Sequence, residues 1–220
     1  MSSAKGFVIV IMDLRGSGFQ GDRHRKEVYR RLGELEVQDA IHVIRESSKL
    51  PFIEKDRISI WGWSFGGFLV PKIIAKNNRF GLNLIKSGIA VSPVAKWQYY
   101  DSVYTERYMC TPTSADNWEG YDQADLTKDM KDMKDDQLLL VHGTADENVQ
   151  LVHTMLLTKK LTYYGIVFNQ MIYPDENHGL VGVLPHLFSL MEDFLLSTLG
   201  NSTIVFPEDV TYTLSDMLTN

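Results

Sequence analysis

The chain has 220 residues, 44% of them hydrophobic, and a formal net charge of -6 at neutral pH. This length is enough for one domain with a substantial core, and an acidic chain gives no electrostatic basis for binding nucleic acid. No apolar run reaches the roughly 20 residues that span a bilayer, and the single cysteine, Cys110, excludes an internal disulfide.

Apolar segments of two kinds alternate along the chain. Short apolar runs predict strands at 6–12, 57–63, 85–94, 137–146 and 166–174, and longer periodic segments predict helices at 34–47, 66–76, 153–165 and 184–199. The first run, "GFVIVIM", is typical of a strand covered on both faces. The alternation predicts an α/β fold, a mostly parallel sheet with helices on both faces, within a domain spanning residues 1–200.

Two segments stand apart from this alternation. In residues 125–137, "DLTKDMKDMKDDQ", the charges alternate, which favours a solvated helix or turn. Residues 201–220 are read as a polar C-terminal tail that is loosely attached to the domain. They open with "NST", an acceptor sequence for N-glycosylation at Asn201.

The sequence "GWSFG" at 62–66 lies between a predicted strand and a predicted helix. Serine in such a turn is typical of a nucleophile elbow, in which Gly62 and Gly66 let the strand and helix pack closely. The turn exposes the Ser64 hydroxyl and aims the backbone N–H of Phe65 at a developing oxyanion. The alternative is a glycine-rich turn without catalytic function.

A serine nucleophile needs a base, and the α/β-hydrolase fold supplies its acid and histidine after later strands. Asp146 follows the fourth predicted strand and His178 follows the fifth, so the order is right. Ser64, Asp146 and His178 are therefore predicted to form a catalytic triad at the carboxyl ends of the strands. Other nearby carboxylates could orient the histidine instead: Glu147, Asp175 and Glu176.

The remaining histidines are not spaced as a metal-binding pair and are interpreted as core or surface residues: His24, His42, His142, His153 and His186. His142 ends a strand and is a candidate for positioning the Asp146 loop. No dinucleotide-binding fingerprint or phosphate loop is present. The sequence therefore predicts no cofactor and no metal.

Several motifs resemble the dipeptidyl peptidase IV and fibroblast activation protein branch of the prolyl oligopeptidase family. They are "MDLRGSGFQGD", "RRLGELEVQDAI", "GWSFGG", "AVSPVAKWQYYDSVYTERYM", "LLLVHGTADENV" and "DENHG". The resemblance covers about residues 6–196 and implies part of an α/β-hydrolase catalytic domain. It also implies a serine peptidase that releases N-terminal dipeptides after a penultimate proline or alanine.

The same resemblance assigns residues to the substrate site. A flat apolar pocket for the proline ring would be lined by Val94, Trp97, Tyr100, Tyr104 and Val149. Asn148 would bind the carbonyl of the residue before that proline. Without the resemblance, core packing is the favoured interpretation of the aromatic cluster.

The resemblance also implies parts that these residues do not contain. A tyrosine hydroxyl that completes the oxyanion hole, and a propeller with paired glutamates that bind the substrate amine, are expected upstream of Gly6. The first strands of the full sheet are expected there too. Because loss of one oxyanion donor costs about 10²–10³ in rate, an inactive module that acts through protein interactions is an alternative function. A carboxylesterase-like hydrolase is another.

Relatives in this branch also suggest an environment. They are type II membrane proteins or secreted, so a plasma-membrane or secreted location is expected, with any anchor upstream. Relatives dimerise partly through their last helices, so 184–199 is a candidate dimer contact, although its apolar face could simply cover the sheet. Ser87 stands where vertebrate relatives carry a disulfide-bonded cysteine.

Overall fold

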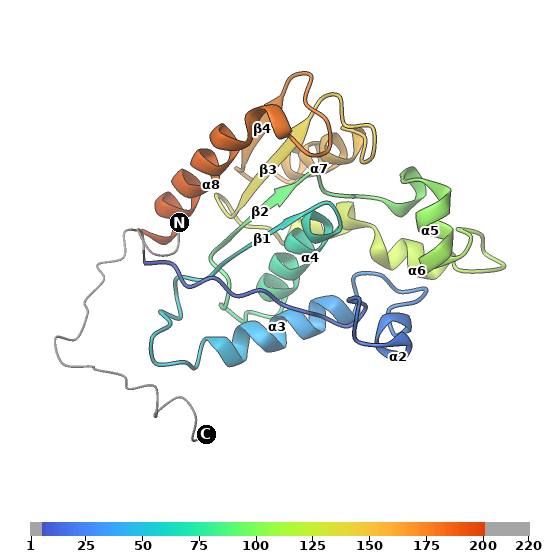
Figure 1. Cartoon of the computed structure of the whole chain (residues 1–220), viewed down its shortest axis with the longest axis horizontal. Coiled ribbons are helices and arrows are strands. Elements are labelled where there is room, and N and C mark those ends of the chain that lie inside the picture. Colours follow the sequence, from blue (N-terminus) through green and yellow to red (C-terminus); the bar gives the residue numbers. More distant parts are fainter. Residues whose placement is uncertain (1–5, 201–220) are drawn as a thin grey trace.

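The fold is known from a computed structural model, which describes residues 6–200 (Figure 1). Its elements, in chain order, are α2 (Asp22–Lys26), α3 (Leu35–Ser47), β1 (Ser59–Trp63), α4 (Phe65–Arg79), β2 (Ser87–Val91), the 3-10 turn η1 (Trp97–Tyr99), α5 (Ser102–Met109), α6 (Trp118–Ala124), η2 (Leu126–Asp132), β3 (Leu138–Gly143), α7 (Val152–Tyr163), β4 (Asn169–Tyr173), η3 (Val181–Val183) and α8 (Leu184–Leu199). The chain is thus α/β, as predicted.

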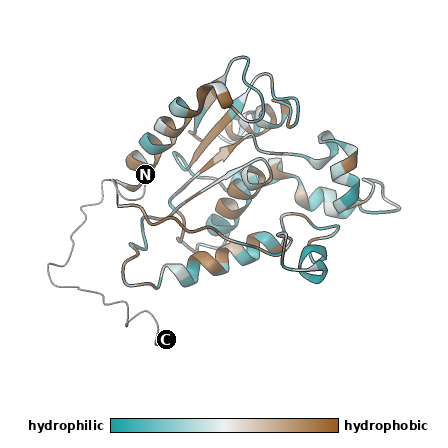
Figure 2. Cartoon of the chain, viewed as in Figure 1, coloured by the Kyte–Doolittle hydropathy of each residue, from teal (hydrophilic) through white to brown (hydrophobic). Residues whose placement is uncertain are grey.

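The four strands form one parallel sheet in the order β1-β2-β3-β4. Strands β2 and β3 are buried along their whole length and are the apolar centre of the molecule (Figure 2). Parallel strands buried on both faces are typically continuous apolar runs, and these two follow that pattern.

Helices cover both faces of the sheet. On one face, α4 and α7 share a core with Ile60, Ala90 and Leu140, and α3 packs against α4. On the other face, α8 contributes Leu187, Met191 and Phe194, which pack against β2 and β3. The apolar side of α8 therefore covers the sheet.

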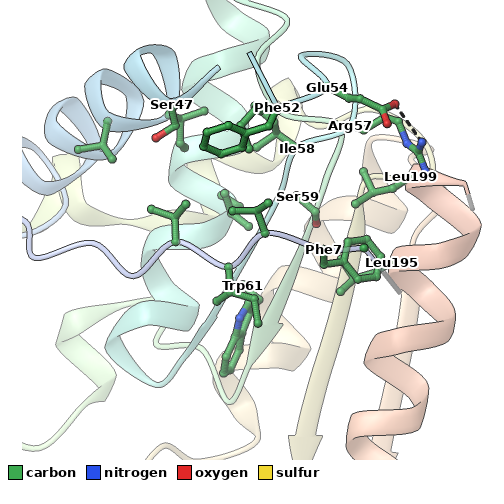
Figure 3. A pocket seen from close by; sticks show the side chains of 18 of the residues that line it. Phe7, Ser47, Phe52, Glu54, Arg57, Ile58, Ser59, Trp61, Leu195 and Leu199 are labelled. Carbon is green, nitrogen blue, oxygen red and sulfur yellow. Dashed lines mark hydrogen bonds and ion pairs between the residues drawn. The ribbon is translucent and has the colours of Figure 1, made fainter. Parts of the chain in front are cut away.

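The prediction of a strand at 6–12 is wrong for this structure. Residues 7–14 have no assigned secondary structure, and Val8, Ile9, Val10 and Ile11 are each more than half exposed. A strand needs a hydrogen-bonding neighbour, and the nearest described strand, β1, is separated from this segment by a cavity (Figure 3). The segment is apolar as a strand would be, but no strand among the described residues pairs with it.

The expectation that 125–137 is a solvated segment is also wrong in part. Leu126 and Met130 in η2 are fully buried, and η2 packs closely against α4. Part of its charge faces basic side chains of α4, because Asp129 accepts hydrogen bonds from Lys72 and Arg79. The charged residues that do remain exposed, as expected, are Lys128, Lys131, Lys134, Asp135 and Asp136. The apolar residues Leu126, Met130 and Met133, spaced among the charges, are buried. The alternation of charge alone does not predict this burial.

Candidate active site

Ser64 occupies a strained turn between β1 and α4. Its backbone lies at φ 59° and ψ −114°, a region that costs a non-glycine residue free energy and is found where a fold holds a side chain in place. A Cβ added to Gly62 would overlap the backbone of Gly66. One added to Gly67 would lie 2.7 Å from the carbonyl oxygen of Val91.

The expectation that a missing side chain at Gly66 permits close packing is wrong, whereas the same expectation for Gly62 is confirmed. Gly62 and Gly67 are needed because backbone approaches them closely, whereas a Cβ on Gly66 would meet nothing within 4 Å. The first-turn N–H groups of an α-helix lack intrahelical partners. The N–H of Phe65, the first residue of α4, is one of these groups, and it has no acceptor within residues 6–200, so it can donate to an anion beside Ser64.

Asp146 and His178 meet at the carboxyl ends of β3 and β4. Asp146 Oδ2 lies 2.7 Å from His178 Nδ1, so the carboxylate accepts the Nδ1 proton and leaves Nε2 free to act as a base. Asp146 is buried, while the side chain of His178 is 21% exposed. The arrangement therefore has the orientation that a catalytic dyad requires.

His142 lies next to the carboxylate of Asp146 and helps to position it. Its Nε2 lies 2.7 Å from the carbonyl oxygen of Val149 and 3.2 Å from Asp146 Oδ2, so this nitrogen carries the proton. Its Nδ1 then accepts from the Thr154 hydroxyl at 2.7 Å. The ring joins the Asp146 carboxylate to the backbone at Val149, in line with the positioning role suggested for His142 from the sequence.

The carboxylate of Asp146 is held ionised. Burial alone would raise its pKa, but hydrogen bonds from His142, His178 and the N–H of Val149 outweigh burial and hold the pKa well below its usual value. Oδ1 accepts from the N–H groups of Asn148 and Val149 at 3.0 and 2.8 Å. A permanently charged carboxylate at this place stabilises an imidazolium on His178.

The other carboxylates lie elsewhere. Glu147 and Asp175 are exposed, and Glu176 accepts a hydrogen bond from the N–H of Gly182 at 3.1 Å. Among the described residues, the carboxylate that hydrogen-bonds to His178 is that of Asp146. The geometry thus favours Asp146 over the three alternatives.

Ser64 lies at the carboxyl ends of the parallel strands, as Asp146 and His178 do. The indole N–H of Trp63, the residue before Ser64, donates to the carbonyl oxygen of His178 at 3.0 Å. Within residues 6–200 the Ser64 hydroxyl forms no hydrogen bond with His178. Catalytic hydrogen bonds are often long before substrate binds.

An aromatic cluster adjoins the Ser64 turn. The ring of Trp97 stacks on Tyr104 with centroids 5.8 Å apart and meets Tyr100 edge to face at 5.8 Å. Phe65 and Phe68 of α4 contact the Trp97 ring at 6.0 and 5.2 Å. Burial raises the pKa of Tyr104 to about 12, so its hydroxyl stays neutral and the cluster is uncharged.

The residues assigned to the proline pocket differ in exposure. Val94, Trp97 and Val149 are at most 1% exposed, whereas Tyr100 and Tyr104 are partly exposed. Asn148 is exposed, and its Oδ1 accepts from the Tyr100 hydroxyl at 2.6 Å. Because that oxygen is occupied, the Asn148 amide directs its NH₂ group elsewhere. Ring contacts join Trp97, Tyr100 and Tyr104 to one another and to Phe65, the residue after Ser64. The N–H groups of Asn148 and Val149 donate to Asp146, and Val94 belongs to the same buried core as Trp97 and Val149.

His153 was expected to be a core or surface residue, and it is in the core. Its Nδ1 accepts from the N–H groups of Ala95 and Lys96, at 3.0 and 3.4 Å, and so fixes the segment between Val94 and Trp97. Burial lowers its pKa to about 4. The contact joins α7 to a loop 57 or 58 residues away, and nothing in the local sequence signals it.

Comparison with known proteins gives the lineage. The model of the prolyl oligopeptidase family matches residues 1–202. The chain belongs to the prolyl oligopeptidase family. It is 41% identical over 197 residues to dipeptidyl peptidase 4 of Bos taurus and 42% identical over 196 residues to prolyl endopeptidase FAP of Homo sapiens. Each alignment covers 89% of this chain and 25% of the relative.

Relatives from insects and bacteria agree. Venom dipeptidyl peptidase 4 of Vespula vulgaris is 40% identical over 195 residues, which are 88% of this chain and 25% of that protein. The crystal structure of Porphyromonas gingivalis dipeptidyl peptidase 4 superposes with a TM-score of 0.76 at 38% identity, covering 84% of this chain and 26% of that one. This family member therefore spans about a quarter of the length of its relatives, and its fold is part of an α/β-hydrolase domain.

No helix among residues 6–200 has both the length and the apolar character needed to cross a membrane. One of the matching relatives is named as a venom protein. Asn201 lies outside the described residues.

Proposed function

We propose that this chain carries the catalytic triad of a serine peptidase that releases N-terminal dipeptides after a penultimate proline or alanine. The observation that supports this most directly is the 2.7 Å contact of Asp146 with His178 Nδ1, at the sheet edge that also carries the strained Ser64 turn. The membership of the prolyl oligopeptidase family supports the same chemistry.

The roles follow from the geometry. Ser64 Oγ attacks the scissile carbonyl while His178 Nε2 takes its proton, and the Phe65 N–H donates to the oxyanion. His178 then gives the proton to the leaving amine, which departs and leaves an acyl ester on Ser64. Water, deprotonated by His178, hydrolyses that ester. Asp146 stabilises the imidazolium in both halves of the reaction.

The aromatic cluster suits the proposed substrate. A proline side chain is rigid and apolar, so the partly exposed rings of Tyr100 and Tyr104, packed on buried Trp97, would remove it from water without a polar partner. The Asn148 NH₂ group would donate to the carbonyl of the preceding residue, because its oxygen is held by Tyr100. In the proposal, the aromatic rings and the Asn148 NH₂ group select the proline and the residue before it. Neither takes part in bond breaking.

Other parts of the proposal concern the whole protein. The restriction to dipeptides and a second oxyanion donor would come from residues upstream of Gly6. A homodimer through α8 would use its outward side, where Phe188 is 43% exposed. Localisation at the plasma membrane or in the secreted fraction is likewise proposed from the relatives.

Hydrolysis of a Gly-Pro anilide and of a short ester tests the proposal. We expect anilide turnover that Ser64→Ala abolishes and that Ser189→Ala, a change in an exposed serine of α8, leaves intact. Turnover of the ester alone would show an esterase. If this chain does not cleave the anilide and an upstream-extended form does, residues upstream of Gly6 are needed for activity. If neither form hydrolyses the anilide, the proposal of a peptidase is refuted.

A further inference from the structure

One wall of the proposed proline pocket is built on a segment without regular structure. Residues 92–96 follow β2 and belong to no helix or strand, and the chain continues through them toward α5 (Figure 1). Two of the pocket residues, Val94 and Trp97, lie in or directly after this segment and are each 1% exposed. Buried backbone N–H groups that no sheet or helix satisfies need other acceptors. The position of this wall therefore depends on what those acceptors are.

One imidazole nitrogen is the acceptor for two of these groups. The N–H groups of Ala95 and Lys96 donate to Nδ1 of His153, at 3.0 and 3.4 Å. The segment is also tied to η2, because the Ala95 carbonyl oxygen accepts from the first N–H of η2 at 2.9 Å. Pro93 has no N–H to donate. A single side chain of α7 thus accepts from two consecutive backbone groups of the pocket wall.

The surroundings of His153 keep this nitrogen available as an acceptor. The side chain is fully buried in the first turn of α7, and burial lowers its pKa to about 4. The ring is therefore neutral at pH 7, with the proton on Nε2 and a lone pair on Nδ1. The ionisable side chains that act on it are those of His142 and Asp146. The ammonium of Lys96 pairs with Asp125 at 2.9 Å.

The next residue of α7 contacts the other half of the site. The Thr154 hydroxyl donates to His142 Nδ1 at 2.7 Å, and His142 Nε2 lies 3.2 Å from the Asp146 carboxylate. Thr154 is as fully buried as His153. Two adjacent side chains of one helical turn therefore reach different parts of the site, the pocket wall and the acid of the proposed triad. A change in Thr154 is thus a matched control for a change in His153.

We propose that His153 is a positioning residue that sets the preference for proline over alanine, by holding the pocket wall through the N–H groups of Ala95 and Lys96. The inference rests on the proposed function. A proline ring has two methylenes that alanine lacks, and a fitted apolar pocket discriminates by about tenfold or more for each methylene. Such a fit needs walls fixed to within about 0.5 Å. A wall that is free to shift therefore loses this preference while the chemistry at Ser64 continues.

The ratio of kcat/KM for a Gly-Pro anilide to that for a Gly-Ala anilide tests this, in the form of the protein that hydrolyses them. The ratio does not depend on the concentration of active enzyme, so partial unfolding of a variant leaves it unchanged. His153→Leu removes the acceptor, whereas His153→Asn, which has nearly the same size and shape, places an oxygen where Nδ1 was. Thr154→Val removes the neighbouring hydroxyl and keeps the shape of the side chain.

We expect the ratio to fall by about 5–10-fold in His153→Leu. It should stay within about twofold of the parent value in His153→Asn and in Thr154→Val, whatever the effect of Thr154→Val on kcat. An unchanged ratio in His153→Leu would overturn the proposal. An equal fall in Thr154→Val would also overturn it, because the cause would then be a general loosening of α7. If His153→Leu does not fold, His153→Gln, which moves the acceptor by one bond, replaces it with the same expectation.

Amide hydrogen exchange separates this inference from the proposed function. The Ala95 amide should exchange at least about tenfold faster in His153→Leu than in His153→Asn or Thr154→Val, with the amides of β3 equally protected in all three. Equal exchange at Ala95 in the three variants would overturn the positioning role. If no form of the protein hydrolyses either anilide, the peptidase and the preference for proline are both refuted. Exchange at Ala95 then still decides whether His153 holds the wall.

Discussion

Replacement of Glu36 by glutamine should change how the stability of the protein depends on pH. Glu36 is 2% exposed in the first turn of α3, where Oε2 accepts from the Gly33 N–H at 3.0 Å. Among the described residues Oε1 has no hydrogen-bond partner. Burial raises the pKa of Glu36 from 4.5 to about 7, because the ionised form loses its water.

The size and sign of the effect follow from this shift. Between pH 4.5 and 7 the unfolded chain ionises Glu36 before the folded chain does, so the free energy of unfolding falls as pH rises. A shift of about 2.5 units, at 1.36 kcal/mol each, corresponds to a fall of about 3 kcal/mol. Glu36→Gln cannot ionise and keeps the Gly33 bond, so it avoids this fall.

Urea unfolding of both proteins from pH 4 to 8 measures the difference. Relative to the parent, Glu36→Gln should gain about 3 kcal/mol as pH rises from 4.5 to 7 and should show a constant difference outside that range. All other groups cancel in the comparison. A difference that is independent of pH, or that favours the parent as pH rises, would refute the reasoning.

His153 opposes Glu36 in almost the same pH range. Burial lowers its pKa from 6.5 to about 4, so as pH falls from 6.5 to 4 the unfolded chain takes up a proton first and stability is lost. The parent protein should therefore show little net slope from these two groups. In Glu36→Gln the slope due to His153 should become visible, with stability rising from pH 4 to 6.5.

Three further substitutions have defined outcomes. Gly67→Ala should cost about 2–3 kcal/mol in urea unfolding because its Cβ would approach the Val91 carbonyl, and an equal cost in the control Gly66→Ala would contradict this. Ser87→Ala should cost about 1 kcal/mol because Ser87 and Thr198 share a 2.9 Å hydrogen bond between β2 and α8; an unchanged unfolding midpoint would show that the bond adds no stability. In the active form of the protein, Asn148→Ala should lower kcat/KM for a Gly-Pro anilide by about 10–100-fold through loss of one substrate hydrogen bond, and an unchanged value would remove Asn148 from the site.

What the sequence could predict depended on how local each signal is. The Ser64 turn and the four paired strands were predictable because glycine spacing and apolar runs are read within a few residues. The segment 6–12 has an equally clear pattern, yet it forms no strand, because pairing depends on a neighbour that the pattern does not specify. The hydrogen bonds from Ala95 and Lys96 to His153 join distant residues and leave no local signal.

Labelling with a fluorophosphonate, followed by intact mass and peptide mapping, tests most directly whether Ser64, His178 and Asp146 form a working unit. The account predicts one adduct on Ser64, lost in Ser64→Ala and in His178→Ala, and retained in His186→Ala, a change in a histidine outside the proposed triad. An adduct on another residue, or labelling of Ser64 that does not need His178, would contradict it.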